Sequence, residues 1–438
     1  MATWTAAAGG GNWNDNDTWE EGGGYPGAGD NAVLDSGSGN VTVNVASACM
    51  DITCTGYTGT LTLGADLTVY GSLLFVSGMT FTPSTYTVIF AATSSGKTIT
   101  SGGKSFYDVT FNGSGGGWTL QDDLTQTRIT TFTLGTLDLN GKTYTSPFSY
   151  PPITLGAGFT LNVGAGTFQG NGNASLVIPT GATVSATTGT IGRLAGLSVT
   201  GSGLIAISGA ANITTFGTVS INSSNVGFSF GLSSFNIHYG PSSISSNQPF
   251  YNLNIGTTYA VNMTVTMNSN LTVTNNLTIA YKSGYTYTLS AGSYTLTVGG
   301  NFANGGAFTA GTGTVVFDTS AKVSTVSGSI TFNVLQCVTP DKTVLFKAGE
   351  TFTVADFDFA GTSGHLITLD TDTGAGTWTI SDASGTNQVE YCDIHRSAAT
   401  GGASWLAYTA DGNVDGGGNS GWSFSGATST GNMLLMFA

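Results

Sequence analysis

Apolar residues that stand two positions apart recur along residues 60–90 at a nearly constant step. The pairs are Leu61/Leu63, Leu67/Val69, Leu73/Phe75, Met79/Phe81 and Tyr86/Val88. An i, i+2 apolar pair marks the inward face of a short strand. The gaps contain Gly, Ser, Asp or Pro and are long enough to turn the chain but too short for a helix. The sequence therefore predicts a repeated unit made of one short strand and one tight corner.

Three such units make a circuit of about 18–20 residues, which suits one coil of a parallel β-solenoid. Because each coil stacks on the previous one, the core grows along one axis, and a single solenoid accommodates a chain of 438 residues. The predicted fold class is all-β: a right-handed parallel β-solenoid (β-helix) with aromatic-rich caps at both ends. The right hand follows the general bias of parallel crossovers.

The composition indicates an uncharged polar surface over an apolar core. Charged residues make up only 8% of the chain, against about 25% in an average protein, while hydrophobic residues reach 40%. That hydrophobic content excludes a disordered chain. The outward positions must then be occupied mostly by Thr, Ser, Asn and Gly, which suit stacked strands. No segment has the pattern of an amphipathic helix.

Charge and hydropathy exclude several classes of partner. The net charge is −14 with only ten Lys and Arg residues, whereas a nucleic-acid binder needs cations to replace phosphate counterions. No apolar run approaches the about 18 residues of a membrane span, so we expect no membrane insertion. The first residues lack the basic and apolar regions of a secretory signal. Four cysteines are too few for a disulfide framework, and small buried thiols are expected.

Four segments are expected. Residues 1–48 form an N-terminal cap and the strand that leads into the stack, 49–385 the β-solenoid with internal repeats, 386–425 a C-terminal coil and cap, and 426–438 an apolar tail. The repeats match Thr87–Phe90, Lys97, Phe106, Val109 and Phe111 with Thr314–Phe317, Lys322, Phe332, Leu335 and Cys337, and in part with Phe250, Leu253 and Ile255. Such self-similarity indicates duplication within one solenoid.

Tryptophans gather at both ends of the chain. Near the N-terminus they are Trp4, Trp13 and Trp19, and near the C-terminus Trp378, Trp405 and Trp422. The first and last coils of a solenoid lack a neighbour on one side, so a lid is needed there. We expect these indoles to plug the open ends. A sugar-binding aromatic platform at the N-terminus is the alternative.

Carboxylate pairs are the candidates for catalysis. They are Asp122/Asp123, Asp356/Asp358 and Asp370/Asp372. In a strand, Asp356 and Asp358 would point to the same side about 6–7 Å apart, which lies between the separations of retaining and inverting glycosidases. However, alternation with Phe357 and Phe359 is also what a strand with two rings in the core and two carboxylates in water would show. We favour this second interpretation.

Other candidate sites are weaker. Residues 14–17 read Asn-Asp-Asn-Asp and offer oxygen ligands for Ca²⁺, but they lack the glycine and distal glutamate of an EF-hand, so a polar loop is expected. The histidines His238, His365 and His395 show no metal-binding spacing. There is no phosphate loop and no nucleophile elbow. We therefore expect no enzyme activity, no catalytic residue, no metal site and no cofactor.

The C-terminal run over residues 389–424, which closes on residues 432–437, resembles the ends of β-helical structural proteins of tailed bacteriophages. The order of Trp, Gly, Pro and Asp near the N-terminus is similar to theirs as well. The resemblance implies a virion-surface role, such as a head fibre, decoration protein or tail fibre, assembled in the host cytoplasm. It also implies a homo-oligomer, with a trimer plausible, and other virion proteins as partners. A cell-surface glycan is a further candidate partner.

Two alternatives stay open. A phage tailspike-type polysaccharide depolymerase would need a clustered acidic groove, and carboxylates are sparse in this chain. A bacterial surface adhesin would normally carry an export signal.

The end of the chain is the candidate partner-binding segment. Its large apolar side chains belong to Met433, Leu434, Leu435, Met436 and Phe437. Residues 425–431 before it are small and polar and allow reach. Burying these side chains would contribute about 1.5–3 kcal/mol each before the entropy of ordering is subtracted. We expect the tail to dock on a neighbouring subunit or on the virion, with folding back onto the last coil as the alternative.

Overall fold

The computed structural model of the protein describes residues 1–146, 152–170, 174–225, 229–239, 242–256 and 259–426. The chain divides into two compact units, Met1–Ser233 and Ser234–Ala438. Apart from two 3-10 helices in the described residues, η1 (Asn16–Thr18) and η2 (Thr409–Asp411), the regular structure in both units is β-strand. Neither helix is long and apolar enough to cross a bilayer.

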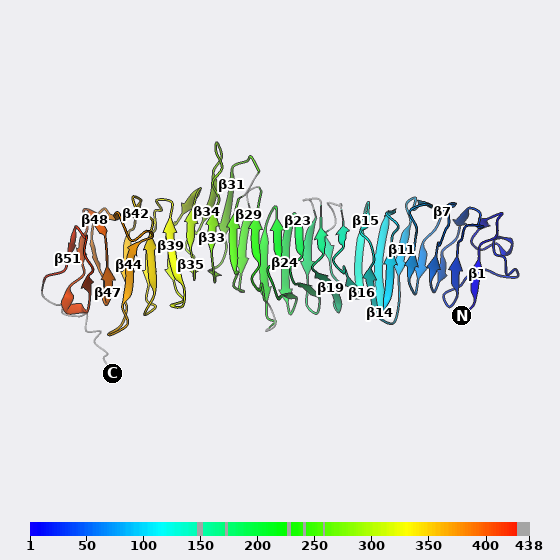
Figure 1. Ribbon diagram of the computed structural model, residues 1–438, viewed down its shortest axis with the longest axis horizontal. Coiled ribbons are helices and arrows are strands. Elements are labelled where there is room, and N and C mark those ends of the chain that lie inside the picture. Colours follow the sequence, from blue (N-terminus) through cyan, green and yellow to red (C-terminus); the bar gives the residue numbers. More distant parts are fainter. Residues whose placement is uncertain (147–151, 171–173, 226–228, 240–241, 257–258, 427–438) are drawn as a thin grey trace. The chain divides into compact units, whose positions relative to one another are not determined.

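In the first unit the strands form rows, in which strands from successive coils hydrogen-bond side by side (Figure 1). One sheet contains, in order, β1 (Thr3–Thr5), β3 (Asn31–Val33), β6 (Ile52–Thr53), β9 (Leu73–Leu74), β12 (Lys97–Thr100), β14 (Asp108–Leu120), β16 (Thr130–Asp138), β19 (Phe159–Gly164), β22 (Thr183–Ala186) and β25 (Leu204–Ile207). A branch of the same sheet contains β5 (Ser47–Cys49), β8 (Leu67–Val69) and β11 (Thr87–Phe90), and β11 pairs with the long strand β14. A second row contains β2 (Gly11–Asn12), β4 (Val41–Val43), β7 (Thr60–Leu63) and β10 (Thr80–Thr82). A third contains β13 (Ser105–Phe106), β15 (Leu124–Gln126), β17 (Thr143–Thr145), β20 (Thr167–Gln169), β23 (Thr190–Leu194) and β26 (Asn212–Thr215), and a fourth β18 (Ile153–Thr154), β21 (Ser175–Ile178), β24 (Gly196–Gly201) and β27 (Val219–Ser223).

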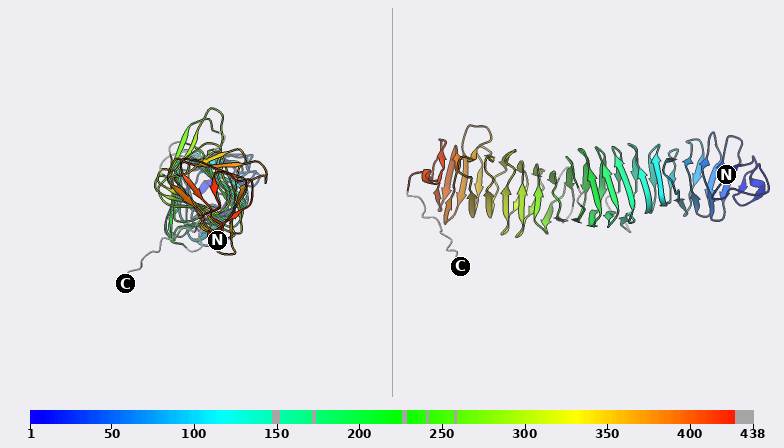
Figure 2. Two further views of the ribbon diagram at one scale, coloured as in Figure 1. Left: turned by 90° about the vertical axis from the view of Figure 1, so that its left-hand side faces the viewer. Right: turned by 90° about the horizontal axis from the view of Figure 1, so that it is seen from below.

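The second unit has the same organisation, and Figure 2 shows the strands of its rows lying side by side. The longest row contains β28 (Ser234–Ile237), β30 (Asn252–Ile255), β33 (Leu277–Ile279), β36 (Phe302–Asn304), β39 (Val323–Ser327), β41 (Thr343–Phe346), β44 (Ile367–Thr371), β47 (Cys392–Ile394) and β50 (Val414–Asp415). Two further rows contain β29 (Ser242–Ser246), β31 (Met263–Met267), β34 (Tyr287–Ser290) and β37 (Ala307–Thr309), and β32 (Leu271–Val273), β35 (Thr295–Val298), β38 (Thr314–Phe317), β40 (Val334–Cys337) and β43 (Asp356–Phe359). The last two contain β42 (Thr351–Thr353), β45 (Trp378–Asp382) and β48 (Ser397–Gly401), and β46 (Thr386–Gln388), β49 (Ser404–Leu406) and β51 (Trp422–Ser423).

Neighbouring strands of each row run parallel, with register shifts between β14 and β16, between β19 and β22 and between β23 and β26. After β7, β8 and β9 the chain returns to its starting side, where Phe81 pairs with Leu61 after 20 residues. In the second unit Leu277 pairs with Phe302, so that coil takes 25 residues. The parallel β-solenoid expected from the six-residue step is therefore confirmed, with coils slightly longer than three such steps.

The inward pairs predicted for residues 60–90 form the core, with two exceptions. Leu61, Leu63 and the pairs that follow are fully buried, but Phe81 and Tyr86 are only half-buried. Phe81 lies on β10, the outermost strand of its row, so no further strand of that row covers it. In β11 the buried pair is Val88/Phe90, one step later than the pattern suggested.

Aromatic side chains stack along the core of the first unit. The ring centroids of Phe90 and Phe111 lie 5.2 Å apart, and those of Phe111 and Phe132 5.6 Å apart, both in stacked geometry. Each ring occupies the same register position one coil after the previous ring. These three successive coils each add one ring to the column, and stacking contributes about 0.5–1.5 kcal/mol per pair beyond the burial of area.

The internal repeats have equivalent pairings. In the first unit Val88 pairs with Val109, and in the second unit Val315 pairs with Leu335, at the positions that the repeat equates. The first strand of each copy therefore pairs with the last one, β11 with β14 in the first unit and β38 with β40 in the second. The repeated sequence therefore encodes one coil and the strand that covers it.

Asn and Asp side chains reinforce the register between coils. Asn276 Oδ1 accepts a hydrogen bond from the backbone N–H of Asn301 at 3.0 Å, and Asn301 Oδ1 accepts one from Thr325 at 2.8 Å. In the first unit Asp66 Oδ1 accepts from Thr87 at 2.9 Å. Each acceptor directly precedes an inward apolar residue, and its donor occupies the same place one coil later. We call this arrangement the coil-register bond.

Two tryptophans close the N-terminal end of the first unit. Trp13 and Trp19 are buried, their ring centroids lie 5.0 Å apart, and the rings meet edge to face. Both indole N–H groups donate to backbone carbonyls, Trp13 to Pro26 at 3.2 Å and Trp19 to Trp13 at 2.8 Å. Because neither ring presents a face to solvent, the plug is confirmed for this pair, and an exposed sugar platform is excluded for them.

The C-terminal indoles are less completely covered. Trp405 is buried, but Trp422 is only half-buried, because it lies on β51, the outermost strand of its row. The two ring centroids are 5.2 Å apart, and both rings lie near Phe357, at 6.0 and 6.2 Å. The C-terminal cap therefore has a buried inner indole and a partly exposed outer one.

Replacing Trp13 should destabilise the first unit strongly. We expect Trp13→Ala to lower the free energy of unfolding by about 3 kcal/mol or more, because the ring is fully buried and Trp19 loses its partner. The matched variant Trp422→Ala should cost clearly less, since that ring is half-exposed. Denaturant titration followed by far-ultraviolet circular dichroism measures both. Equal losses for the two variants would contradict the difference in burial.

Removing one coil-register bond should cost about 1 kcal/mol. Asn301→Ala deletes the acceptor of the Thr325 N–H, whereas Asn301→Asp keeps an oxygen at the same place. We therefore expect the alanine variant to unfold at lower denaturant concentration than the aspartate variant. If both variants lose the same stability, the side-chain acceptor has no role in holding the register.

Candidate functional site

The Asp356/Asp358 pair lies on β43, which pairs with β40. Along this strand Phe357 and Phe359 are buried and stack at 4.2 Å, while Asp356 is exposed and Asp358 half-buried. The alternation of core rings and outward carboxylates expected from the sequence is therefore confirmed.

The surroundings of Asp356 raise the pKa of its carboxyl group. Partial burial is the main cause, and the nearby charges of Asp358 and Asp382 add to it. Asp358 Oδ2 accepts from Gln336 Nε2 at 2.6 Å, and Asp382 Oδ2 from Asn387 Nδ2 at 2.8 Å. A carboxyl group with a raised pKa suits a general acid. A glycosidase also needs a second carboxylate, but Asp358 and Asp382 are already hydrogen-bonded to side-chain amides.

The other two carboxylate pairs have structural partners. Asp122 accepts from the backbone N–H groups of Ser101 and Gly102 at 2.6 and 2.7 Å, and Asp123 from Thr143 at 2.8 Å. These contacts fix corners and register between coils, and each uses the oxygens that catalysis would need.

Asp370 and Asp372 are engaged in the same way. Arg396 forms a fork with Asp370, its Nε donating to Oδ1 at 2.8 Å and its Nη2 to Oδ2. Asp372 accepts from the backbone N–H of Ala348 at 3.0 Å. A bidentate Arg–carboxylate pair is geometrically specific, so this contact ties β44 to the coil that contains β47.

Residues 14–17 form a polar loop around η1. Asp15 Oδ1 accepts from the backbone N–H of Asp17 at 3.2 Å and caps the helix, while Asn14 Oδ1 accepts from Asn44 Nδ2 at 2.8 Å. Across the described residues, no three His, Cys, Asp or Glu side chains come together in a group that could hold a metal ion.

The three histidines lie apart and have different surroundings. His365 contacts Asp341, and His395 contacts Asp393, each at 2.9 Å. Burial lowers the pKa of His238, whose ring lies 6.0 Å from that of Tyr259. The structure does not bring these histidines into one site.

All four cysteines are buried free thiols, as expected. Burial raises the pKa of Cys54 to about 12 and that of Cys337 to about 11, and it raises those of Cys49 and Cys392 as well. Thiols held in this neutral form lack the thiolate character of a nucleophile.

One buried cation lies inside the second unit. The Lys342 ammonium is fully buried and donates to the backbone carbonyls of Gly299, Thr319 and Lys322, at 2.9, 3.1 and 2.8 Å. Burial lowers its pKa to about 8, so the group keeps its proton at neutral pH and satisfies all three acceptors. Lys342 thus joins carbonyls of preceding coils and has a structural role.

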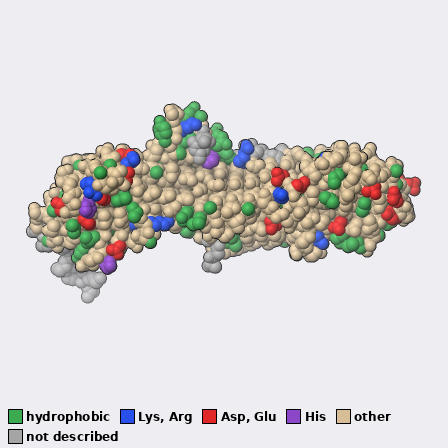
Figure 3. Space-filling model, viewed as in Figure 1, with side chains coloured by type: hydrophobic (Ala, Val, Ile, Leu, Met, Phe, Trp, Pro, Cys, Tyr) green, Lys and Arg blue, Asp and Glu red, His purple; other side chains and the backbone are tan. Residues whose placement is uncertain are grey.

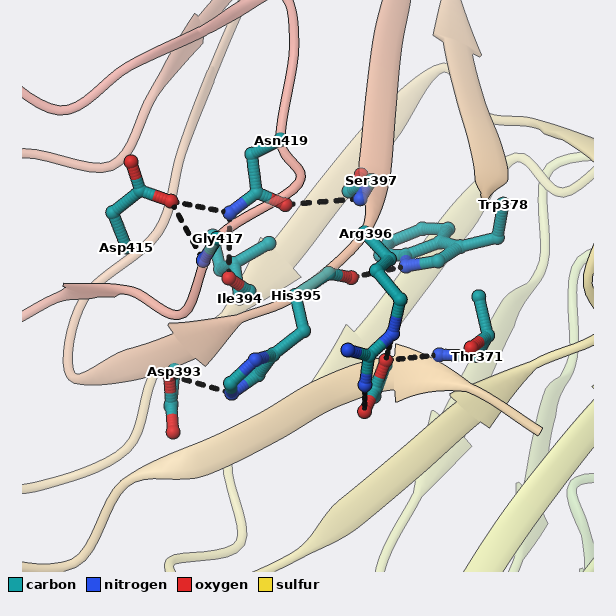
Figure 4. A network of polar contacts seen from close by, with 11 residues as sticks. Thr371, Trp378, Asp393, Ile394, His395, Arg396, Ser397, Asp415, Gly417 and Asn419 are labelled. Carbon is teal, nitrogen blue, oxygen red and sulfur yellow. Dashed lines mark hydrogen bonds and ion pairs between the residues drawn. The ribbon is translucent and has the colours of Figure 1, made fainter. Parts of the chain in front are cut away.

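A network of polar contacts lies in the last coils of the second unit (Figure 4). Asn419 Oδ1 accepts from the backbone N–H of Ser397 at 2.9 Å, and its Nδ2 donates to the carbonyl of Ile394 and to Asp415 at 2.6 and 2.7 Å. In Figure 4, Trp378 Nε1 points to the carbonyl of His395, with a hydrogen bond of 2.9 Å. The network therefore fastens the final coil to the one before it.

Asn413 acts in the same manner. Its Oδ1 accepts from the backbone N–H of Cys392 at 2.8 Å, and its Nδ2 donates to the carbonyls of Val389 and Tyr408 at 2.7 and 3.0 Å. Nothing in the sequence marks Asn413, Asn419 or Arg396 as contact residues. Each of their contacts joins residues of different coils and depends on the register between those coils.

The predicted partner-binding residues Met433, Leu434, Leu435, Met436 and Phe437 lie outside the described residues, which end at residue 426. Their proposed docking stays a prediction from the sequence.

Taken together, the fold and these contacts define a parallel β-solenoid protein whose carboxylates, amides and buried lysine mainly join successive coils. Comparison with protein-family models, with curated proteins and with solved structures found no match to this chain.

We expect the protein to release no reducing ends from a panel of bacterial surface polysaccharides, because its best candidate acid, Asp356, has neighbours that are already hydrogen-bonded. A reducing-end assay after prolonged incubation measures this. Release that disappears in the double variant Asp356→Asn/Asp358→Asn would contradict the expectation and favour a depolymerase.

Proposed function

We propose that the chain is a structural surface appendage of a virus particle, a phage fibre or capsid decoration protein that contributes to host-surface attachment. The observation that carries the proposal is the continuous register of coils inside each unit. Parallel hydrogen bonds, coil-register bonds and stacked core rings make each unit a stiff stack. A stiff stack suits a spacer that holds one part of an assembly away from another.

The viral setting is supported by the resemblance of residues 389–424 and 432–437 to β-helical phage structural proteins. The sparse charge of the surface favours an exposed assembly component over a nucleic-acid-binding one. In this proposal the chain forms a homo-oligomer, with the apolar side chains of the tail contacting a neighbouring subunit or another virion protein.

A tailspike-type depolymerase is the second candidate, favoured by the raised pKa of Asp356. The adhesin alternative has no specific contact in its favour. We rank the appendage first because the candidate carboxylates mostly hold coils together.

Labelling of particles tests the proposal. Antibodies raised against the purified chain should decorate the surface of virus particles from the source of this sequence, seen by immunogold electron microscopy. Antibody absorbed with the purified chain is the control. Gold on cell envelopes and none on particles would contradict the proposal and favour the adhesin.

A variant that ends at residue 431 lacks the apolar tail and shows whether the tail attaches the protein to particles or stabilises its fold. If the tail attaches the protein, this variant unfolds at the same temperature as the full chain but does not sediment with particles. A loss of thermal stability in the isolated variant would instead assign the tail to the cap.

A further inference from the structure

A groove of about 350 Å³ runs across the C-terminal ends of β33, β36, β39 and β41 in the second unit. These strands belong to one row, and the register Thr278–Ala303–Ser327 brings successive coils together there. The volume is at the lower end of the about 300–1,000 Å³ that ligand sites occupy. The residues that line the groove are Thr278, Ile279, Ala280, Tyr281, Ala303, Asn304, Gly305, Ser327, Gly328, Lys347 and Glu350.

Beneath the groove the coils approach each other closely at two glycines. A Cβ atom on Gly305 would lie only 2.8 Å from the Tyr281 backbone nitrogen, and one on Gly328 would lie 1.8 Å from the Asn304 carbonyl oxygen. Gly328 also has a φ of +105°, which disfavours any other residue. Glycine is therefore required at both positions for the coils to approach each other.

Tyr281 is the aromatic residue among those that line the groove. Its side chain belongs to a short hairpin closed by the antiparallel bridge between Lys282 and Tyr285, and the residue is 76% exposed. Figure 3 shows hydrophobic and basic side chains, and no acidic ones on the visible face, on the projection beside β31 and β34. An aromatic residue this exposed gains little from the fold itself, so its ring is available to a ligand.

Donor and acceptor groups line the groove together with Tyr281. Lys347 Nζ lies 3.8 Å from Asp372 Oδ2, too far for a hydrogen bond, so its donors remain available. Glu350 Oε2 accepts from the backbone N–H groups of Gly328 and Ser329 at 2.5 and 3.3 Å, which fixes this carboxylate. The buried Asn304 Oδ1 atom has no hydrogen-bond partner in the described part of the chain. The groove thus combines an ammonium donor with a positioned carboxylate, while the Asn304 oxygen is too buried to contact a ligand.

We propose that this groove binds a neutral hexopyranose unit of a polysaccharide, with one sugar face stacked on Tyr281. Pyranose rings have an apolar C–H face that packs on aromatic rings, and hydroxyls that both donate and accept hydrogen bonds. The positive charge of Lys347 is balanced locally by Glu350 and Asp372, so the groove does not select a charged sugar. The flat, open form of the site suits one unit inside a longer glycan.

Affinity electrophoresis tests this site with the full chain. Native gels that contain dextran, mannan, galactan or amylose should retard the protein in at least one case, compared with a gel that lacks polysaccharide. We expect Tyr281→Ala to weaken this retardation by about tenfold or more, as for an aromatic residue at the centre of a contact. Lys347→Gln should weaken it to a smaller extent, and alginate should retard the protein less than the neutral polymer does.

Tyr285→Ala is the matched control. Tyr285 is 40% exposed and lies on the same hairpin, but it does not line the groove. It should leave retardation within about twofold of the parent chain, with both variants keeping the parental circular dichroism spectrum. Equal losses in Tyr281→Ala and Tyr285→Ala, or no retardation in any neutral gel, would overturn the proposal. So would a change of oligomeric state in Tyr281→Ala, measured by sedimentation, because it would assign the ring to an interface between copies of the chain.

The biological setting of this site rests on the surface role proposed above. Immunogold labelling tests that role and affinity electrophoresis tests the groove, so either result can be negative without the other. Retardation without gold labelling of particles would keep the groove and reject the virion assignment. Labelling without retardation would do the reverse.

Discussion

The parallel register between successive coils is the constraint on which the rest of the structure depends. Each strand takes its backbone partners from the coils on either side, so every coil must return its inward residues to the same place. The pairings of Leu61 with Phe81 and of Leu277 with Phe302 show that coils of 20 and 25 residues meet this requirement equally. Corners absorb the difference in length, while the strands keep their positions and the core remains continuous.

The sequence predicts the strands well because side-chain alternation is a local property. The pairs Leu61/Leu63 and Leu67/Val69 point inward as the two-residue spacing requires. It predicts the pairing of coils less well, because that depends on corner lengths that vary from coil to coil. The coil-register bond of Asn301 has a visible local signal, an Asn directly before an inward apolar residue. Its partner, Thr325, can be named only once the length of the intervening coil is known.

The candidate sites divide in the same way. The outward direction of Asp356 and Asp358 follows from alternation along one strand and was predictable. The groove beside Tyr281 was not, because Asn304 and Lys347 come from later coils and meet Tyr281 only through stacking. Nor could the sequence show that Arg396 forms a fork with Asp370, since these residues are 26 positions apart and their contact requires a known register.

The same stacking that hides such sites in the sequence also determines how they can arise. A solenoid core cannot open to hold a ligand without breaking the register, so a site must form on the outer face, across several coils. It needs consecutive coils that approach each other closely, as Gly305 and Gly328 allow here, and a larger exposed side chain beside them, as Tyr281 is. Because a Cβ atom at Gly305 or Gly328 would meet the backbone of the neighbouring coil, packing requires both glycines whether or not a ligand is bound. Packing of the fold does not require the exposed ring of Tyr281. A binding role for the groove therefore depends on this residue.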